Sequence, residues 1–423
     1  MSGPLSGLRV VELATAIQGP AVGLHFANMG ADVVKVEPPM GDASRYHRGV
    51  NNTLPEHTDG AQFVAMNKGK RSVVLDLHAE PGPQVMHALL ATADVFLSNY
   101  RAAALARMSL DLDQLAARYP RLVVGHVNGF GPRGPDAAKA MLDGAAQARG
   151  GLASLSGNPH ATPTPPGAAV ADHAGAMQLA LGCVTALVTR ATTGRGQVVR
   201  TSSLGAQLWL QMWELQHSFL TGVPLSRDGG HHPNIKAPYG VYTTSDGVHI
   251  LFVTAITNEA WSDFWIFVDR PEVILLEDWD SPGKRVGAGG SGAGVGEIRA
   301  LVREAFASKP WSEWAAFLNA QPGLVWERVR DHGDVLGDPQ NAANDYVVEI
   351  ELPMVGKTST VGTLMDFSAT PTDAPAPPPG LGAHTGEVMA ALGFDAEAIA
   401  KVTRHAAETR DEMLAALLGD DGL

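Results

Sequence analysis

The stretch LRVVELATAIQGPAVGLHFANMGADVVKVEPP, residues 8–39, decides the fold class. Residues 8–13 are rich in β-branched and apolar side chains, which is typical of a buried strand. The apolar segment 21–29 is predicted to be a helix, ended by Gly30 in a left-handed conformation after its last turn. A second β-branched strand follows at 31–37. A strand–helix–strand unit with such short connections predicts parallel strands joined by a right-handed crossover.

The same alternation continues along the chain. We expect further strands at 72–77, 95–98, 122–127 and 198–200, and helices at 82–93, 112–118 and from about 172 onward. Alternating elements of this kind are typical of an open α/β sheet. In the second half we expect an apolar helix at 204–220, a hairpin of a smaller α+β section at 240–243 and 248–253, a glycine-rich loop at 286–296, and helical segments at 296–318 and 386–418.

Composition excludes several classes of protein. The 423 residues carry 31 Lys and Arg against 44 Asp and Glu, a net charge of −13, which disfavours sequence-independent nucleic-acid binding. The single cysteine, Cys183, excludes a disulfide framework and a multi-cysteine metal site. No signal peptide is evident, and polar residues interrupt every apolar run before the roughly 20 residues that span a bilayer. We therefore expect a cytoplasmic enzyme with no nucleic-acid or membrane partner.

Common catalytic and nucleotide-binding motifs are missing. The loop ATAIQGP at 14–20 has nothing like G-x-G-x-x-G, although Glu37 ends the second strand where an acidic residue would hold a ribose, so a nicotinamide oxidoreductase is disfavoured. The sequence also lacks the P-loop, H-E-x-x-H and G-x-S-x-G motifs. The pair His231 and His232 suits a loop better than a metal site, and Cys183 suits a helix core better than a nucleophile.

Asp172 is the carboxylate that stands out. It follows a loop rich in proline and glycine and opens a long helical pattern. One interpretation is a helix N-cap, for which Asp is among the best residues. The other is a catalytic carboxylate that the positive end of the helix keeps ionised, with small neighbours that leave room for a ligand. Spacing alone favours the cap.

A series of segments adds a family to these observations. They read PLSGLRVVEL at 4–13, QGPAVGLHFANMGADVVKVEPPMGDASR at 18–45, NKGKRSVVLDL at 67–77, ADVFLSNYR at 93–101, NGFGPRGP at 128–135, AVADHAG at 169–175, TGRGQVV at 193–199, HHPNIKAPYGVYTTSDG at 231–247, DPQNAANDYVVEI at 338–350 and LGAHTGEV at 381–388. In this order the series resembles the family III CoA transferases, a group that includes formyl-CoA transferase, carnitine CoA-transferase and α-methylacyl-CoA racemase.

The resemblance implies an architecture and a reaction. Residues 1–200 would begin a large Rossmann-like CoA-binding domain that 331–423 complete, with a linker helix at 201–226 and a small α+β domain at 227–330 between them. Two subunits would interlock as a homodimer. Asp172 would attack an acyl-CoA thioester to form a mixed anhydride and then carry CoA as an aspartyl thioester, before CoA passes to a carboxylic acid. The CoA thioester is a substrate, and no permanently bound cofactor is implied.

The family's positions also imply a CoA site. Asn99, Arg107 and Met108 match residues that line the nucleotide portion, and Leu75 matches a position whose backbone meets the adenine. Residues 17 and 18 fall in the loop beside the thioester.

The loop beside the thioester contains Ile17 and Gln18. Four further residues are expected around CoA. Lys70 and Arg71 are expected near phosphates on charge grounds, as part of a locally basic cleft. Finally, Gly229 and Gly230 fall where formyl-CoA transferase carries a longer glycine run that closes over the active site.

One departure from the family bears on the reaction. The racemase branch carries a catalytic His where this chain has Leu142, and two-base racemisation needs an acid–base group on each face of the α-carbon. Formyl-CoA transferase has Tyr there, so Leu142, Ala145 and Ala146 would suit a larger or less polar acyl group. We therefore predict an acyl-CoA:carboxylate CoA-transferase. The alternatives are a racemase or intramolecular CoA-transferase on the same scaffold, and a subunit of a heteromeric transferase.

Overall fold

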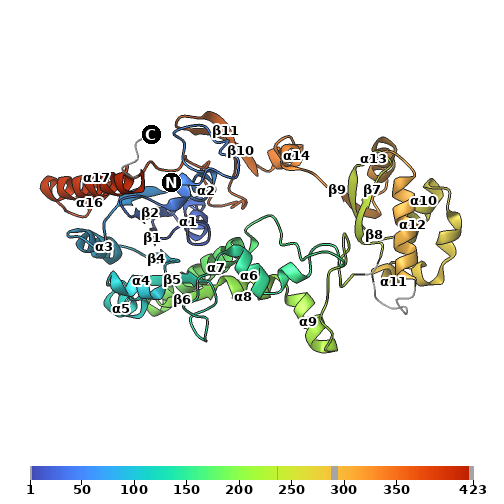
Figure 1. Ribbon diagram of the computed structural model, residues 1–423, viewed down its shortest axis with the longest axis horizontal. Helices are drawn as coiled ribbons and strands as arrows, with labels where there is room; N and C mark the ends of the chain where they lie inside the picture. The colour runs from blue at the N-terminus through green and yellow to red at the C-terminus, as the bar shows by residue number, and fades with distance from the viewer. Residues whose placement is uncertain (1, 236, 287–293, 419–423) are drawn as a thin grey trace. The chain divides into compact units, whose positions relative to one another are not determined.

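The computed structural model describes residues 2–235, 237–286 and 294–418, and the chain divides into two compact units (Figure 1). The large unit comprises Met1–Gly150, Ala168–Leu210 and Leu336–Leu423, and the small unit comprises Gly151–Gly167 and Gln211–Val335. Both units have buried apolar cores of their own. Most of the expected glycine-rich loop 286–296 lies outside the described residues.

A six-stranded sheet forms the centre of the large unit. Its order is β3 (Arg71–Val74), β2 (Asp32–Glu37), β1 (Arg9–Leu13), β4 (Val95–Ser98), β5 (Val123–Asn128) and β6 (Val198–Ser202). Every neighbouring pair is parallel, as the opening stretch of sequence predicts. The strand order reverses between β1 and β4, and in sheets of this kind ligands bind at the carboxyl ends of the strands beside that point.

Helices cover both faces of this sheet. Successive residues of β1 point to opposite faces, so Val10 enters the core formed with α1 and α7, whereas Val11 enters the core formed with α3, α5 and α17. Burial on both faces explains why the strands read as continuous β-branched runs rather than as an alternating pattern. Figure 1 shows α16 and α17, in red, beside the blue N-terminal strands. The helices of the large unit are α1 (Gln18–Asn28), α2 (Ala61–Met66), α3 (Gly82–Ala91), α4 (Ala102–Arg107), α5 (Leu112–Arg118), α6 (Asp143–Arg149), α7 (Val170–Thr193), α8 (Ser203–Leu210), α15 (Pro339–Ala343), α16 (Thr385–Ala391) and α17 (Ala396–Leu418).

Helix α7 is long and apolar enough to cross a membrane by length and composition alone. In this structure Leu179 and Cys183 are completely or almost completely buried in the core that α7 shares with α1 and the sheet. A soluble protein's core helix passes the same test of length and composition, and in α7 39% of the apolar window is buried.

The small unit packs helices against a three-stranded antiparallel sheet. The predicted hairpin is confirmed as β7 (Gly240–Thr243) and β8 (His249–Ala255), and β9 (Leu324–Arg328) adds a third strand. Aromatic rings fill this core, with Phe306 and Trp314 centred 4.4 Å apart. The small unit's helices are α9 (Met212–Thr221), α10 (Asn258–Phe267), α11 (Pro282–Val286), α12 (Val295–Ala307) and α13 (Trp311–Asn319), and α14 (His332–Leu336) lies at its end.

Several features differ from the sequence predictions, and two of them are informative. The single helix expected at 204–220 is two helices, α8 and α9, because the chain leaves the large unit between Leu210 and Gln211. A hairpin of β10 (Val347–Leu352) and β11 (Gly356–Val361) was not predicted. Its second strand, GKTSTV, is half-buried to exposed along its length and has no apolar face to signal it.

Candidate active site

Asp172 is the third residue of α7 and is half-buried. The N-cap position is Ala169, which provides no side-chain cap. The cap comes instead from Asp143, the first residue of α6, whose Oδ1 accepts the backbone N–H groups of Ala171 at 2.7 Å and of Asp172 at 3.1 Å. The capping role that spacing alone assigned to Asp172 is therefore wrong, since another carboxylate takes it.

The Asp172 carboxylate itself is left without a partner. Among the residues that the structure describes, none forms a hydrogen bond or an ion pair with its oxygens. Burial, and then the nearby charge of Asp143, raise the pKa of Asp172 to about 7. We expected the helix N-terminus to keep this carboxylate ionised, but removal from water and a second carboxylate oppose that effect. The result is a carboxylate that titrates near neutral pH and is unusually basic when ionised.

Gln18 lies against the same stretch of α7. It is the first residue of α1, is 5% exposed, and its Nε2 donates to Ser203 Oγ at 2.6 Å. A Cβ on Gly175 would lie 2.3 Å from that Nε2, so the amide rests directly on the helix at Gly175. Gly175 follows Asp172 by three residues, and residues at this spacing share a helix face. The structure therefore brings Gln18 and Asp172 to one face of α7, with the half-buried Ile17 at the N-cap of α1.

The loop before Gln18 is held by side chains from other segments. Asn99 Nδ2 donates to Thr15 O at 2.8 Å, and Asn99 Oδ1 accepts the Thr15 N–H at 3.0 Å. Asp42 Oδ1 accepts the Ala16 N–H at 3.2 Å, where the backbone has a left-handed φ of 65°. Asn99 was expected to line the CoA nucleotide, and the structure gives its amide the task of fixing this loop.

Asp42 belongs to a buried network of charges that sequence reasoning missed. Lys35 Nζ lies 2.9 Å from Asp42 Oδ2 and 3.1 Å from Glu12 Oε1, and it also donates to Ala14 O at 2.8 Å. Burial alone would raise the pKa of Asp42, but the Lys35 ammonium and hydrogen bonds from Ser44 hold it down to about 2. The signals in the sequence were charged residues inside buried strands, Glu12 in β1 and Lys35 in β2.

A cavity of about 360 Å³ lies at the carboxyl ends of β1 and β2. It brings together Leu75 and Met108, which were both predicted to contact CoA. Arg107 precedes Met108 at the end of α4, is exposed, and has no hydrogen bond or ion pair with any described residue. The lining residues are Leu13, Glu37, Pro38, Pro39, Leu75, Asp76, Leu77, His78, Tyr100, Met108, Thr409 and Met413.

The expected contacts of Lys70 and Arg71 with phosphates are wrong for this structure. Lys70 is buried, and its Nζ reaches Glu12 Oε2 at 2.7 Å, Pro20 O at 2.8 Å and Asn67 Oδ1 at 2.9 Å, so that all three ammonium protons are used. Burial lowers the pKa of Lys70 to about 8.

Arg71 lies at the other end of the sheet from the cavity. It opens β3 and forms a two-pronged ion pair with Asp32, which opens β2, with bonds of 2.8 and 2.5 Å. Both residues lie at the amino ends of their strands, whereas ligands bind at the carboxyl ends. Charge alone did not show at which edge of the sheet this arginine would lie.

The glycine pair and the histidine pair belong to the small unit. Gly229 is exposed, has a left-handed φ of 64° and donates its N–H to Gly157 O at 3.2 Å, while Gly230 O accepts the Val241 N–H. His232 stacks on Trp213 with ring centres 5.2 Å apart, and its Nε2 lies 3.2 Å from Glu214 Oε1.

The His231 ring lies against the strand that follows, with Nδ1 3.1 Å from Tyr239 O. Within the described residues no group of three or more His, Cys, Asp or Glu side chains could hold a metal ion. Cys183 is buried, and burial raises the pKa of its thiol to about 12, which suits the predicted core residue rather than a nucleophile.

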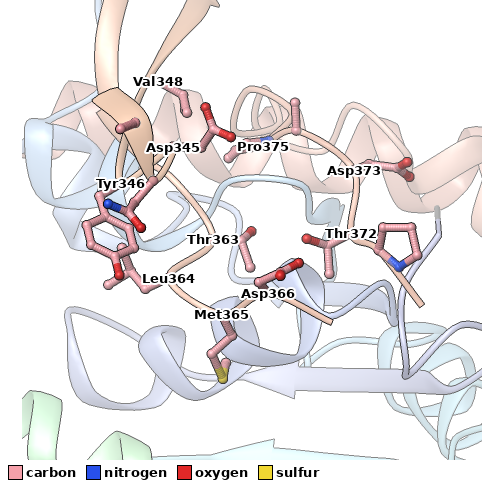
Figure 2. A pocket seen from close by; sticks show the side chains of 14 residues that line it. Asp345, Tyr346, Val348, Thr363, Leu364, Met365, Asp366, Thr372, Asp373 and Pro375 are labelled. Carbon is pink, nitrogen blue, oxygen red and sulfur yellow. The ribbon is translucent and has the colours of Figure 1, made fainter. Parts of the chain in front are cut away.

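A second cavity, of about 610 Å³, lies in the segment that returns to the large unit (Figure 2). Figure 2 shows three aspartates, Asp345, Asp366 and Asp373, among its lining side chains. None of the predicted site residues lines it. Three carboxylates in one cavity disfavour a polyanionic ligand such as CoA, so we place the candidate site at the strand ends and at α7 instead.

The structure combines an α/β fold with a cavity at the strand ends and a half-buried carboxylate at a helix start. The family model of CoA-transferase family III matches residues 5–385, and the chain belongs to this family. The protein is accordingly an enzyme of the CoA-transferase class.

Relatives with assigned names align along almost the whole chain. A succinate–glutarate CoA-transferase of Agrobacterium fabrum is 31% identical over 397 residues, covering 92% of this chain and 96% of that protein. An (R)-2-hydroxy-4-methylpentanoate CoA-transferase of Clostridioides difficile is 28% identical over 397 residues, covering 93% of this chain and 97% of that protein. A crystal structure of a CaiB/BaiF family protein from Brucella suis superposes with a TM-score of 0.80 at 29% identity, covering 93% of this chain and 100% of that one.

Proposed function

We propose that this protein transfers CoA from an acyl-CoA thioester to a carboxylic acid, with Asp172 as the nucleophile. The observation that carries the proposal is the unpartnered, half-buried Asp172 carboxylate. Asp143 caps the start of α7, so Asp172 is not needed for that role. A buried carboxylate freed from other bonds and raised in basicity is suited to covalent catalysis. Succinate, glutarate and 2-hydroxy-4-methylpentanoate, named for the relatives, indicate the class of acids to test first.

The proposed reaction proceeds by four exchanges at acyl carbons. An Asp172 oxygen attacks the thioester carbonyl, the C–S bond breaks, and CoA leaves as a thiolate from a mixed anhydride. The thiolate attacks the aspartyl carbonyl, which releases the donor acid as a carboxylate and leaves an aspartyl-CoA thioester. The acceptor carboxylate displaces CoA from that thioester to form a second anhydride. CoA thiolate then attacks the acceptor's acyl carbon, and the Asp172 carboxylate is restored with no net proton change.

The chain's own groups support these steps in two ways. The start of α7 puts the positive end of the helix dipole near Asp172, which favours negative charge developing on a carbonyl oxygen there. Gln18 lies against α7 at Gly175, one turn beyond Asp172, and we infer that its buried amide helps to keep water from the anhydride.

The side chain before Asp143 supports transfer rather than racemisation. Leu142 is the N-cap residue of α6 and is 80% exposed, so the position of the racemase histidine carries no acid–base group. Ala146 is completely buried and adds no room for an acyl group, whereas Leu142 and Ala145 are exposed and available to one. We therefore propose an acyl group with an apolar portion.

The Asp172→Asn variant tests the proposal. Its transfer rate should fall by about 10⁴-fold or more, since a catalytic nucleophile acts in every covalent step. Calorimetric titration should still detect CoA binding, because the cavity at the strand ends is untouched. Transfer at the wild-type rate by this variant would disprove the role of Asp172. A product that forms from one acyl-CoA without an added acid would favour the intramolecular isomerase instead.

We also propose the interlocked homodimer as the working unit. Large apolar side chains are exposed on the large unit: Leu181 is 69%, Val188 67% and Trp209 62% exposed. Apolar surface of this kind commonly marks an interface. Light scattering should give twice the chain mass of 44.4 kDa at micromolar concentration, and the mass of one chain would contradict the proposal. A co-purifying second protein from the native source would indicate the heteromeric alternative.

A further inference from the structure

The cavity at the strand ends has a wall that comes from the far end of the chain. Ten of its lining residues lie between Leu13 and Met108, whereas Thr409 and Met413 come from the C-terminal helix α17. Sequence reasoning gave this helix no part in ligand binding. The cavity therefore joins the first and last parts of the large unit.

The inner face of α17 explains how it reaches the cavity. Ile399 and Val402 pack on the large unit's core, and Ala406, four residues after Val402, is buried at 8% exposure. Spacings of three and four residues continue this stripe to Thr409 and Met413. Met413 is nevertheless 45% exposed, because the stripe runs past the core and over the cavity. An apolar side chain on the inner face of a helix thus meets empty space.

A polar contact anchors α17 beside the cavity. His405 Nε2 lies 2.9 Å from Asp76 Oδ2, and Asp76 itself lines the cavity directly after Leu75. One turn further along α17, Thr409 is half-buried at the cavity wall. The contact fixes the helix over the loop that follows β3, so Met413 is held near Leu75.

The lining chemistry suits a flat aromatic base. Leu13, Pro38, Leu75, Leu77 and Met108 offer apolar surface, and thioether sulfur makes favourable contacts with aromatic rings. Arg107 is the residue before Met108, and its exposed guanidinium can pair with a phosphate outside the cavity. An aromatic base bearing phosphates is the chemistry of the nucleotide half of CoA.

We propose that Met413 of α17 closes over the adenine of CoA and is a determinant of nucleotide affinity, with His405 as the residue that positions the helix. The proposal rests on the proposed function, since it takes CoA as the ligand. Helix α17 supplies a wall of the cavity that the strand ends do not form. Loss of this wall weakens binding of the nucleotide half and leaves the chemistry at Asp172 unchanged.

The test compares Met413→Ala with Leu414→Ala, a matched control at the next position. Leu414 is 37% exposed and does not line the cavity. Calorimetric titration with CoA and with adenosine 3′,5′-bisphosphate should show Met413→Ala binding both probes about fivefold more weakly, the loss expected for a half-buried Met side chain. Leu414→Ala and Met413→Leu should bind like the wild type.

The outcomes separate the two proposals. Wild-type affinity in Met413→Ala, or equal losses in Met413→Ala and Leu414→Ala, overturns the role of Met413 and leaves the role of Asp172 standing. A wild-type protein that binds neither probe overturns both proposals. Because the readout is binding, an inactive Asp172 variant does not affect the result.

Discussion

Two groups of carboxylates in the large unit, one buried and one half-buried, differ in how their charges are balanced. Around β1 and β2, Glu12 and Asp42 face the ammonium of Lys35 at 3.1 and 2.9 Å. At the start of α7, Asp143 and Asp172 face each other with no cation among the described residues in contact with either. The pKa of Asp42 falls to about 2 despite its burial, whereas burial and Asp143 raise the pKa of Asp172 to about 7. Matched charges fix the loop before Gln18, whereas the unmatched pair gives Asp172 the basicity that its proposed role as nucleophile needs.

Removal of the cation from the balanced group should have the largest effect. Lys35→Met leaves Asp42 buried without a cation and leaves Glu12 with Lys70 alone, which should lower the free energy of unfolding by about 3–5 kcal/mol. Chemical denaturation measures this change. Arg71→Ala is the control, since its pair with Asp32 is partly exposed and should contribute about 1 kcal/mol or less. Equal losses in the two variants would contradict the structural role of the Lys35 network.

A methyl group on α7 should disturb the reactive group without loss of the fold. In Gly175→Ala the new Cβ would lie 2.3 Å from Gln18 Nε2, and the end of this side chain must move away from Ser203. Misplacement of a group near the reacting atoms should lower kcat/KM by about 10- to 100-fold. Gly182→Ala on the same helix is the matched control, because its Cβ meets only Val199 Cγ1, at 2.7 Å. Equal activity of the two variants would show that Gln18 is not needed in place.

Removal of the Asp143 charge should shift the pH dependence of kcat/KM. Asp172 must be ionised to attack, so kcat/KM should fall as the pH drops through its pKa of about 7. In Asp143→Asn the amide oxygen still accepts the two N–H bonds at the α7 start, but the negative charge that raises the pKa of Asp172 is gone. The acid limb of the pH–rate profile should therefore shift to lower pH. An unchanged limb would mean that Asp143 does not set the basicity of Asp172.

The sheet could be predicted from the sequence because its signals are local. Because β1 and β2 are buried on both faces, their sequences are largely continuous apolar runs. Gly30 has the left-handed φ of 90° expected after α1. In the β10–β11 hairpin, the second strand gave no such signal, since GKTSTV is mostly polar and half-buried to exposed.

The site was predicted in part, because its decisive contacts join distant segments. Leu75 and Met108 meet in the cavity as expected. Asp143, which caps α7, lies 29 positions before Asp172 in the sequence. Glu12, which pairs with Lys70, lies 58 positions before it. No local pattern links such pairs, so charge alone placed Lys70 and Arg71 at a phosphate that they do not face.

Mass spectrometry of the intact protein tests the covalent role of Asp172 most directly. After incubation with an acyl-CoA that the protein turns over, in the absence of an acceptor acid, a fraction of the chain should gain the mass of CoA less one water. Hydroxylamine should convert that adduct to a hydroxamate located at Asp172 by peptide mapping, and Asp172→Asn should show no adduct. A wild-type protein that transfers CoA but never carries it, or carries it on another residue, would contradict the proposed mechanism.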